Sequence, residues 1–236
     1  MITVSFFYIF PLVVSFLLSL ALTLILIKIS KHLKSCFLIS KQYSNSKNIS
    51  RFGGVAIIIA FLVAIFFTGN LEFDNLKWGM VISSVVILFF GFIDDIKNLS
   101  WKKQIFAQVI IALIMLYSGL GVDYIANPFG GAEFRLDGYM YFVFGNQYYL
   151  FSSIFILFLI VGFMNIANWL DGLDGLAGGV GIIGFLTLFF LSISSLVNQP
   201  SLGVISIAAA GAILGFLLFN FYPAKIFMGT SGSMFI

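Results

Sequence analysis

The sequence predicts an all-α protein, a polytopic bundle of about seven transmembrane helices that forms a single integral membrane domain over residues 1–236. Its composition is the first reason, because 61% of the residues are hydrophobic and only 9% are charged. The mean hydropathy of +1.13 is typical of a membrane protein and excludes a soluble globular domain. The second reason is a series of apolar runs long enough to cross a bilayer as helices. The single cysteine, Cys36, excludes a disulfide framework within the chain.

Seven apolar segments are the expected spans. The first has no cationic leader and is too long for a signal-peptide core, so it predicts a transmembrane helix rather than a cleaved signal. Between the fourth and fifth spans, residues 121–149 carry Gly and Pro among alternating aromatic residues and predict a short hairpin or an amphipathic segment. The expected spans cover residues 3–28, 53–69, 78–93, 105–120, 150–167, 177–197 and 202–219.

The basic residues predict the orientation of the bundle. Seven spans divide the rest of the chain into two alternating sets of loops. One set, with Lys28, carries ten of the 12 Lys and Arg residues, and the other carries only Lys77 and Arg135. Because cytoplasmic loops are enriched in Lys and Arg, the first set is expected in the cytoplasm and the N-terminus outside. The cytoplasmic loops are then residues 29–52, 94–104, 168–176 and 220–236.

Four of the nine acidic residues lie on the expected cytoplasmic side, at the ends of spans. A carboxylate within a bilayer costs roughly 2.5–3.5 kcal/mol, so acids at such positions are candidates for function. The other five lie in expected external loops, where solvated surface charge explains them: Glu72, Asp74, Asp123, Glu133 and Asp137. The four candidates are Asp94, Asp95, Asp171 and Asp174.

The first motif, GFIDDIKN (91–98), places two acids side by side at the end of the third span. Neighbouring residues on a helix point about 100° apart, so Asp94 and Asp95 cannot both bind a metal through one face. They can divide the work, one facing a metal or a nucleophile and the other a basic neighbour. The alternative is a charged stop at the membrane interface, balanced by nearby lysines.

The second motif, NIANWLDGLDGL (165–176), repeats a polar residue at every third position. In a helix this spacing places the polar groups on one slowly turning stripe, which suits a hard cation, a ribose or a sugar. The glycines Gly172 and Gly175 allow close approach of a ligand or break the helix. Helix caps followed by a turn are the alternative. The stripe consists of Asn165, Asn168, Asp171 and Asp174.

Two further motifs are less specific. Asn220 ends the seventh span, and a GTSGS loop follows it, which either cradles a phosphate with backbone N–H groups or is a simple turn. SRFGGVAI (50–57) places Arg51 and a glycine pair at the start of the second span. Arg51 either clamps a phosphate or anchors the helix at the interface.

In this order, the four motifs resemble those of the polyprenyl-phosphate N-acetylhexosamine-1-phosphate transferase family. The resemblance covers nearly the whole chain, and DGLDGLAGG (171–179) is its most specific element. It implies an enzyme of the bacterial cytoplasmic membrane that moves a sugar-1-phosphate from a UDP-sugar to undecaprenyl phosphate. The DDIKNLS form (94–100) is more similar to the branch that makes lipid-linked GlcNAc than to the phospho-N-acetylmuramoyl-pentapeptide transferases, which are the alternative. It also implies that C-terminal spans and a His-rich motif of the family are missing.

The resemblance assigns roles by position. Asp94 and Asp95 match the acids that act on the lipid phosphate and its deprotonation, and Asp171 and Asp174 match acids of the catalytic and nucleotide pocket. These four acids are therefore the expected catalytic residues. The expected substrate contacts come from Asn165, Asn168, Asn220, Arg51 and Lys103.

The expected cofactor is Mg²⁺, with Mn²⁺ as an alternative cation. One departure from the family concerns it: the family pattern is FMGDxGS, and its Asp is a principal Mg²⁺ ligand, whereas this chain has FMGTSGS with Thr230 at that position. A threonine hydroxyl can bind Mg²⁺ but adds no negative charge. The expected metal ligands are Asp95, Asp171, Asn220 and Thr230.

The mechanism implied is attack of the lipid phosphate on the β-phosphorus of the UDP-sugar, with UMP as the leaving group. The partners are thus a UDP-sugar, a polyprenyl phosphate and the membrane, with no nucleic acid, and a homodimer stays open. Three rival classes remain: an ion-coupled transporter, an intramembrane aspartyl protease and a non-catalytic homologue. A transporter would carry acids near mid-membrane in inverted halves, whereas these acids gather at one interface.

Overall fold

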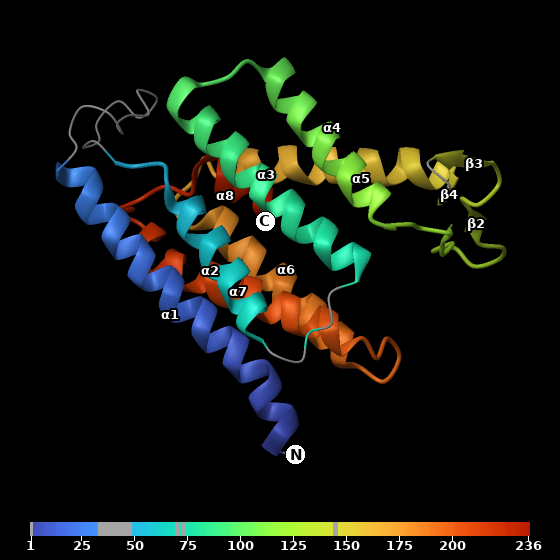
Figure 1. The fold of residues 1–236 in the computed structure, drawn as a ribbon, viewed down its shortest axis with the longest axis horizontal. Helices are drawn as coiled ribbons and strands as arrows, with labels where there is room; N and C mark the ends of the chain where they lie inside the picture. The colour runs from blue at the N-terminus through green and yellow to red at the C-terminus, as the bar shows by residue number, and fades with distance from the viewer. Residues whose placement is uncertain (1, 33–48, 69–70, 72–73, 144–145) are drawn as a thin grey trace.

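The chain folds into a bundle of helices with two small hairpins at one end (Figure 1). The computed structural model describes residues 2–32, 49–68, 71, 74–143 and 146–236. Cys36 and Glu72 lie outside these ranges. In the described part of the chain the helices are α1 (Ile2–His32), α2 (Gly53–Phe67), α3 (Asn75–Lys97), α4 (Trp101–Tyr117), α5 (Leu150–Leu170), α6 (Leu176–Ile193), α7 (Pro200–Asn220) and α8 (Gly229–Phe235).

The all-α membrane fold predicted from the sequence is confirmed. Each of the seven expected spans coincides with one of the helices α1–α7. Five of the described helices are long and apolar enough to cross a membrane, and α2 is a shorter apolar helix. Helix α8, inside the stretch predicted as a loop, is an addition. The five spanning segments are Phe7–Ser30, Asn75–Lys97, Leu150–Leu170, Leu176–Ile193 and Pro200–Asn220.

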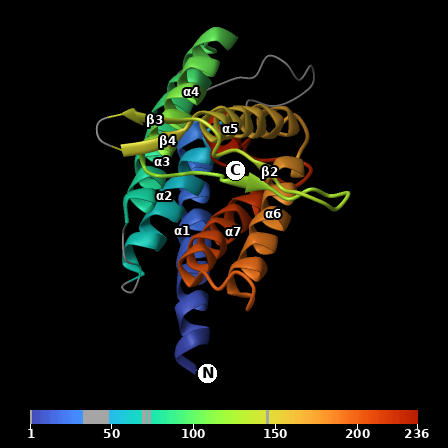
Figure 2. The same ribbon diagram turned by 90° about the vertical axis from the view of Figure 1, so that its right-hand side faces the viewer.

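The segment between α4 and α5 forms two antiparallel hairpins, as its Gly, Pro and aromatic pattern predicted. Strand β1 (Tyr124–Ile125) pairs with β2 (Phe134–Arg135), and β3 (Met140–Val143) pairs with β4 (Asn146–Tyr149). Figure 2 looks onto this end of the bundle, with the hairpins in front of the helices. Helix α4 leads from the close of α3 toward these hairpins, which lie beyond its far end (Figure 1).

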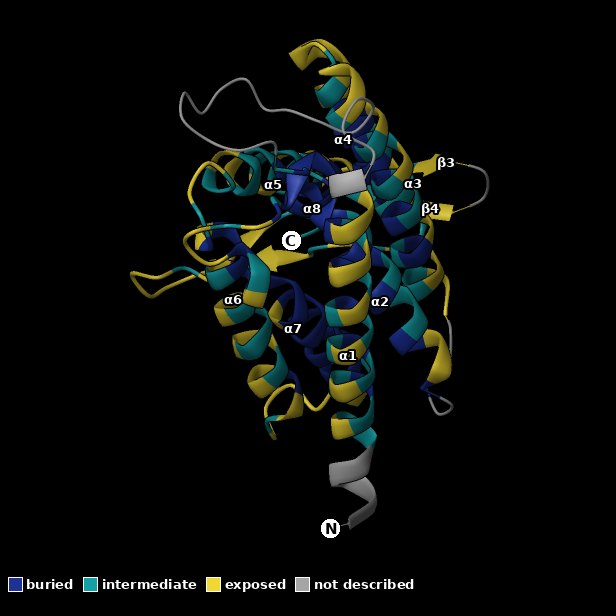
Figure 3. Ribbon diagram, turned by 90° about the vertical axis from the view of Figure 1, so that its left-hand side faces the viewer, coloured by how far each residue is buried: buried dark blue, intermediate teal, exposed yellow. Residues whose placement is uncertain are grey.

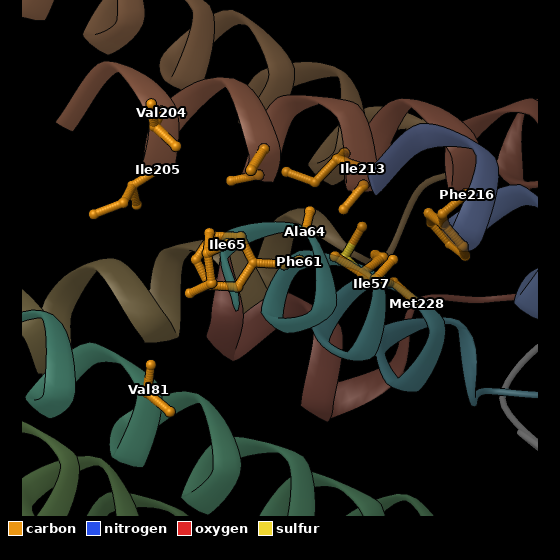
Figure 4. Close-up of a cluster of buried hydrophobic side chains, with 14 of the residues drawn as sticks. Ile57, Phe61, Ala64, Ile65, Val81, Val204, Ile205, Ile213, Phe216 and Met228 are labelled. Carbon is orange, nitrogen blue, oxygen red and sulfur yellow. The ribbon is translucent and has the colours of Figure 1, made fainter. Parts of the chain in front are cut away.

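Helix α7 is the centre of the bundle. It packs against α1, α2 and α6, and 78% of the residues in its apolar stretch are buried. Figure 3 shows it as a dark blue helix behind the more exposed α1 and α6. Figure 4 shows Phe61 of α2 opposite Ile213 of α7 within the main hydrophobic cluster. Small residues allow the close approach of α1, since a Cβ on Gly211 would lie 2.3 Å from the hydroxyl of Ser15.

Helix α8 is the most enclosed element of the bundle. It packs against α2, α3 and α5, and its residues from Gly229 to Met234 are all buried. Two glycines make room for its backbone: a Cβ on Gly54 would lie 2.1 Å from the Gly232 nitrogen, and a Cβ on Gly91 would lie 2.3 Å from the Ser231 Cα atom. The sequence motifs of α2, α3 and α5 therefore meet around this one short helix.

Candidate active site

The chain entering α8 is hydrogen-bonded to the chain entering α2. The Phe227 N–H donates to the Ser50 carbonyl (2.8 Å), and the Gly53 and Gly54 N–H groups donate to the carbonyls of Phe227 (3.0 Å) and Met228 (2.7 Å). The glycine pair after Arg51 thus serves to hold the start of α8. The SRFGGVAI motif and the GTSGS motif lie far apart in the sequence, and these hydrogen bonds join the chain segments that carry them.

Gly229 begins α8 in a conformation and a space that only glycine fits. Its φ is +73°, in the left-handed region that side chains disfavour. A Cβ there would lie 2.0 Å from the Arg51 carbonyl oxygen and 2.7 Å from a carboxylate oxygen of Asp95. The absence of a side chain at this position therefore brings the backbone of α8 against Arg51 and Asp95.

Two carboxylates from distant parts of the chain converge on the first residues of α8. Asp95 accepts a hydrogen bond from the Thr230 N–H (2.8 Å), and Asp171 accepts one from the Gly229 N–H (3.1 Å). The Ser231 hydroxyl adds a longer contact to Asp95 (3.4 Å). Consecutive N–H groups thus hold the two acids side by side, although Asp95 lies in the last turn of α3 and Asp171 caps the end of α5.

Arg51 is the cation beside these carboxylates. Its Nε atom lies 4.0 Å from Asp95 Oδ1, and its side chain is 31% exposed whereas that of Asp95 is fully buried. Burial raises the pKa of Asp171 to about 7, the Arg51 charge and the Gly229 N–H lower it, and the negative charge of Asp95 raises it. Two carboxylates facing one arginine leave an excess of negative charge, which suits a further cation.

Asp94 points away from Asp95, as the helical geometry predicted. It accepts hydrogen bonds from the Leu99 N–H (2.8 Å), from the Gln104 amide at both carboxylate oxygens (3.1 Å each) and from the Thr230 hydroxyl (2.6 Å). Asp94 is only 4% exposed. The two adjacent acids therefore divide the work: Asp95 faces Arg51 and the backbone of α8, and Asp94 joins α3, α4 and the side chain of Thr230.

The two asparagines of α5 contact neighbouring helices. Asn168 accepts a hydrogen bond from the Ser233 hydroxyl of α8 (3.0 Å). One turn earlier, Asn165 donates to the Gln108 side chain of α4 (2.9 Å) and to the Val161 carbonyl (2.7 Å). Asn168 thus reaches α8, whereas Asn165 joins α5 to α4. Their expected substrate contacts stay predictions.

The polar stripe predicted across the second motif is only partly helical. Helix α5 ends at Leu170, and α6 begins at Leu176 after Gly175, whose φ is +75°. The helix break is the alternative that the glycines allowed. Because the chain turns there, Asp174 leaves the stripe and accepts a hydrogen bond from the Ala224 N–H (3.1 Å).

Asn220 joins the two loops beside the site. Its side-chain oxygen accepts from the Gly175 N–H (3.0 Å), and its amide nitrogen donates to the Ile226 carbonyl (2.9 Å). It is 3% exposed. In this structure both ends of the amide are used within the protein, so Asn220 holds the loop after α5 against the loop before α8. Its roles toward substrate and metal stay predictions.

The remaining expected residues lie differently. Lys103 is exposed in the first turn of α4, and its expected contact with substrate stays a prediction. Thr230 directs its hydroxyl at Asp94 and its N–H at Asp95. The GTSGS segment was expected either to cradle a phosphate or to form a simple turn. It forms instead the start of α8, whose first N–H groups are occupied by the protein's own carboxylates.

Sequence reasoning missed three residues of this cluster. Gln104 and Gln108 lie one turn apart on α4 and reach Asp94 and Asn165, and Ser233 of α8 reaches Asn168. A signal for the glutamines was present, since two amides four positions apart in an apolar helix predict a polar face directed at a partner. Ser233 lies within the GTSGS motif, but the motif alone did not single it out, because small polar residues are common in helix turns and caps.

The donor set fits a magnesium ion only with help from a ligand. Among the residues that the structure describes, no three acidic, histidine or cysteine side chains gather into a metal-binding group. Asp95 and Asp171 supply carboxylate oxygens, which Mg²⁺ prefers. Mg²⁺ is commonly held by one or two carboxylates together with substrate phosphates, and this pair is suited to that arrangement.

The family of the chain follows from a match over most of its length. The model of glycosyl transferase family 4 matches residues 77–236, which include most of α3, the turn after α5 and all of α8. The chain belongs to glycosyl transferase family 4. The resemblance inferred from the motifs is thereby confirmed, and members of this family among its relatives are named as phosphosugar transferases.

Three relatives illustrate the range of the family. A Bacillus subtilis protein named "Probable undecaprenyl-phosphate N-acetylglucosaminyl 1-phosphate transferase" is 32% identical over 228 residues, 95% of this chain and 60% of that protein. A phospho-N-acetylmuramoyl-pentapeptide-transferase of Clostridium beijerinckii is 33% identical over 95% of this chain and 69% of its own length. A Sulfolobus acidocaldarius protein, provisionally named a UDP-N-acetylglucosamine–dolichyl-phosphate N-acetylglucosaminephosphotransferase, is 30% identical over 78% of this chain and 54% of its own.

Proposed function

We propose that the protein transfers a sugar-1-phosphate, GlcNAc-1-phosphate in the first instance, from a UDP-sugar to undecaprenyl phosphate and releases UMP. In this reaction an oxygen of the lipid phosphate forms a bond to the β-phosphorus of the UDP-sugar. The bond from that phosphorus to the bridging oxygen breaks, and UMP leaves with the electron pair. The products are a polyprenyl-diphospho-sugar and UMP.

The observation that carries the proposal is the pairing of Asp95 and Asp171 at the start of α8, next to Arg51. The pair lies where α3 and α5 end, so it is at the boundary between apolar helices and their connecting loops. This location suits a reaction whose two substrates meet at a membrane surface, one in the lipid and one in water. The Lys and Arg count predicts that this surface faces the cytoplasm.

Little covalent chemistry is required of the protein. A phosphate monoester has a second pKa near 6, so at neutral pH it is largely a dianion that can attack without a strong base. The tasks left to the chain are binding and charge stabilisation. Arg51, partly exposed beside Asp95, can bind a phosphate oxygen, and Asn168 can orient the sugar or the ribose from the neighbouring turn of α5.

The negative pair Asp95 and Asp171 would repel phosphates without a cation between them. Mg²⁺, or Mn²⁺ in its place, would be held by these two carboxylates and would offset the charge that develops on the leaving UMP. Binding the cation requires Asp171 to be ionised. Its pKa is raised to about 7, and a bound cation would lower this pKa and so favour the ionised form. We assign no share of the cation to Thr230, whose hydroxyl donates to Asp94.

The test is a transfer assay with two donor sugars. The full chain is reconstituted in liposomes that contain undecaprenyl phosphate and Mg²⁺, and UMP release is measured with UDP-GlcNAc or with UDP-MurNAc-pentapeptide. UMP release that depends on both the lipid and UDP-GlcNAc supports the proposal. Release with UDP-MurNAc-pentapeptide alone overturns the GlcNAc assignment, and no release with either sugar from folded protein overturns the transfer reaction.

A further inference from the structure

Asp94 is a buried carboxylate held entirely by neutral donors. Among the described residues no cation pairs with it, and its side chain is surrounded by the Leu99 N–H, the Gln104 amide and the Thr230 hydroxyl. A buried anion without donors is very costly, so the position and charge of Asp94 depend on these three groups. Two of them, Gln104 and Thr230, are side chains from other helices.

The Gln104 amide is the donor that fixes the direction of the carboxylate. It lies 3.1 Å from both Oδ1 and Oδ2 of Asp94, so it sets the plane of the group from the α4 side. Thr230 then donates to Oδ2 at 2.6 Å from the α8 side. Because each side chain contacts the same carboxylate, a shift at Gln104 is transmitted to Thr230 through Asp94.

Thr230 carries this arrangement into the site. Its side chain is fixed by Asp94, and its backbone N–H is the 2.8 Å donor to Asp95. The neighbouring Gly229 N–H holds Asp171. The chain of contacts therefore runs from Gln104 through Asp94 and Thr230 to the two carboxylates that would bind the cation.

We propose that Gln104 is a positioning residue for the transfer reaction, acting through Asp94 and Thr230 on the alignment of Asp95 and Asp171. The proposal rests on the proposed function, because that reaction is its readout. It also gives the uncharged Thr230 side chain a role, which is to hold Asp94 through the hydrogen bond that its hydroxyl donates. Substrate contact is not part of the role, so the effect is expected in kcat and not in KM.

The experiment compares three single substitutions in the reconstituted full chain. Gln104→Met keeps the length of the side chain and removes its donor, and Gln104→Glu keeps the shape and places a second carboxylate against Asp94. Gln147→Met is the matched control, since Gln147 is exposed on β4 at the far end of the bundle, where it contacts Tyr149. Each is assayed for kcat, for KM of the UDP-sugar and for its thermal unfolding midpoint.

The order of kcat values among the variants shows whether Gln104 acts through its hydrogen bonds to Asp94 or through packing. Gln104→Met is expected to lower kcat about tenfold or more and Gln104→Glu to lower it further, with KM within threefold of the unchanged chain and Gln147→Met at full kcat. If packing alone mattered, Gln104→Glu, the closest in shape, would be the milder change. Full kcat in both Gln104 variants, a loss confined to KM, or a milder effect of Gln104→Glu overturns the proposal.

Thr230→Val tests the same contact from the other side if the Gln104 variants do not fold. It keeps the shape of the side chain and removes the hydroxyl donor to Asp94, so it is expected to lower kcat about tenfold with KM retained. Full kcat in Thr230→Val overturns the proposal. An inactive unchanged chain is a different result, because it overturns the proposed function before any variant is compared.

Discussion

The two ends of α3 carry acids of opposite character. At its start, Asp74 has a side chain that is 60% exposed and pairs with Lys77 three positions away, through the backbone N–H (2.9 Å) and the ammonium group (3.2 Å). In its last turn, the side chains of Asp94 and Asp95 are buried. Both accept hydrogen bonds from Thr230, which is more than 130 positions away in the sequence. The same helix therefore ends in a local cap on one side and in a long-range polar cluster on the other.

The two ends differ in what their acidic side chains depend on. Asp74 is exposed and is bonded within its own helix, so we expect its replacement to be tolerated. Asp95 and Asp171 depend on Gly229, Thr230 and Arg51, and they are held beside each other despite their repulsion. Polar clusters held against such a cost gather at functional sites, which is why this end is the candidate active site.

The largest expected effect is on activity at the buried end. Asp171→Asn keeps the shape of the side chain and its hydrogen bond from Gly229, but it removes the charge. We expect kcat for UMP release to fall about 100-fold or more, as is typical when a group that stabilises transition-state charge is lost. Asp74→Asn is the matched control and is expected at full rate, because Asn caps a helix as well as Asp does. Equal rates in the two variants would remove the functional distinction between the two ends.

The second prediction concerns stability and pH. The pKa of Asp171 is raised to about 7 from an ordinary 3.8, so the folded state binds the proton more tightly than the unfolded state. The free energy of unfolding therefore falls as the pH rises from about 4 to 7, by a few kcal/mol at most at about 1.4 kcal/mol per pKa unit. Without substrate or metal, Asp171→Asn should raise the unfolding midpoint above that of the unchanged chain at pH 8 and match it only below about pH 4, where Asp171 is protonated in both states. A variant that is less stable at pH 8 would contradict this.

The third prediction tests the space around α8. Gly54→Ala would place a Cβ 2.1 Å from the Gly232 nitrogen, so it should lower the free energy of unfolding by about 1–3 kcal/mol. The same substitution at Gly162 of α5, where nothing lies within 4 Å of the added Cβ, is the control and should not destabilise the chain. Thermal unfolding in detergent measures both. Equal midpoints would mean that α8 is not tightly enclosed.

The smallest expected effect lies at the exposed end. Asp74→Ala removes the side chain that accepts from the Lys77 N–H, and losing such a cap costs about 1 kcal/mol. The hydrogen bond from Lys77 also lowers the pKa of Asp74. The contribution of ionised Asp74 to the free energy of unfolding is therefore present above the ordinary pKa of 3.8 and is lost as the pH falls through the lowered pKa. A thermal midpoint that drops at pH 7 but not in strong acid is the expected result, with no change in kcat.

The bundle itself could be predicted because hydropathy and length decide helices in a membrane. All seven expected segments are helices, and the acids at their ends were identified by charge position alone. The contacts between motifs could not be predicted in the same way. Nothing local in the sequence indicates that Gly53 and Gly54 bond to Phe227 and Met228.

The direction of individual side chains was also beyond the sequence. The three-residue spacing correctly grouped Asn168 and Asp171, but the turn at Gly175 moved Asp174 to another partner. The motif predicts Thr230 as a metal ligand, which stays a prediction, and nothing in the motif indicates that its hydroxyl donates to Asp94. Such choices depend on which helices become neighbours, and the local pattern does not contain that information.

The central claim is that Asp95 and Asp171 act as one centre, and a double-mutant cycle tests it most directly. UMP release is measured for Asp95→Asn, Asp171→Asn and the double variant, with folding checked for each. If the pair holds one cation at one reaction centre, each single variant loses about 100-fold or more and the double variant loses little beyond the worse single one. Losses that multiply in the double variant would show two independent groups and would contradict the account.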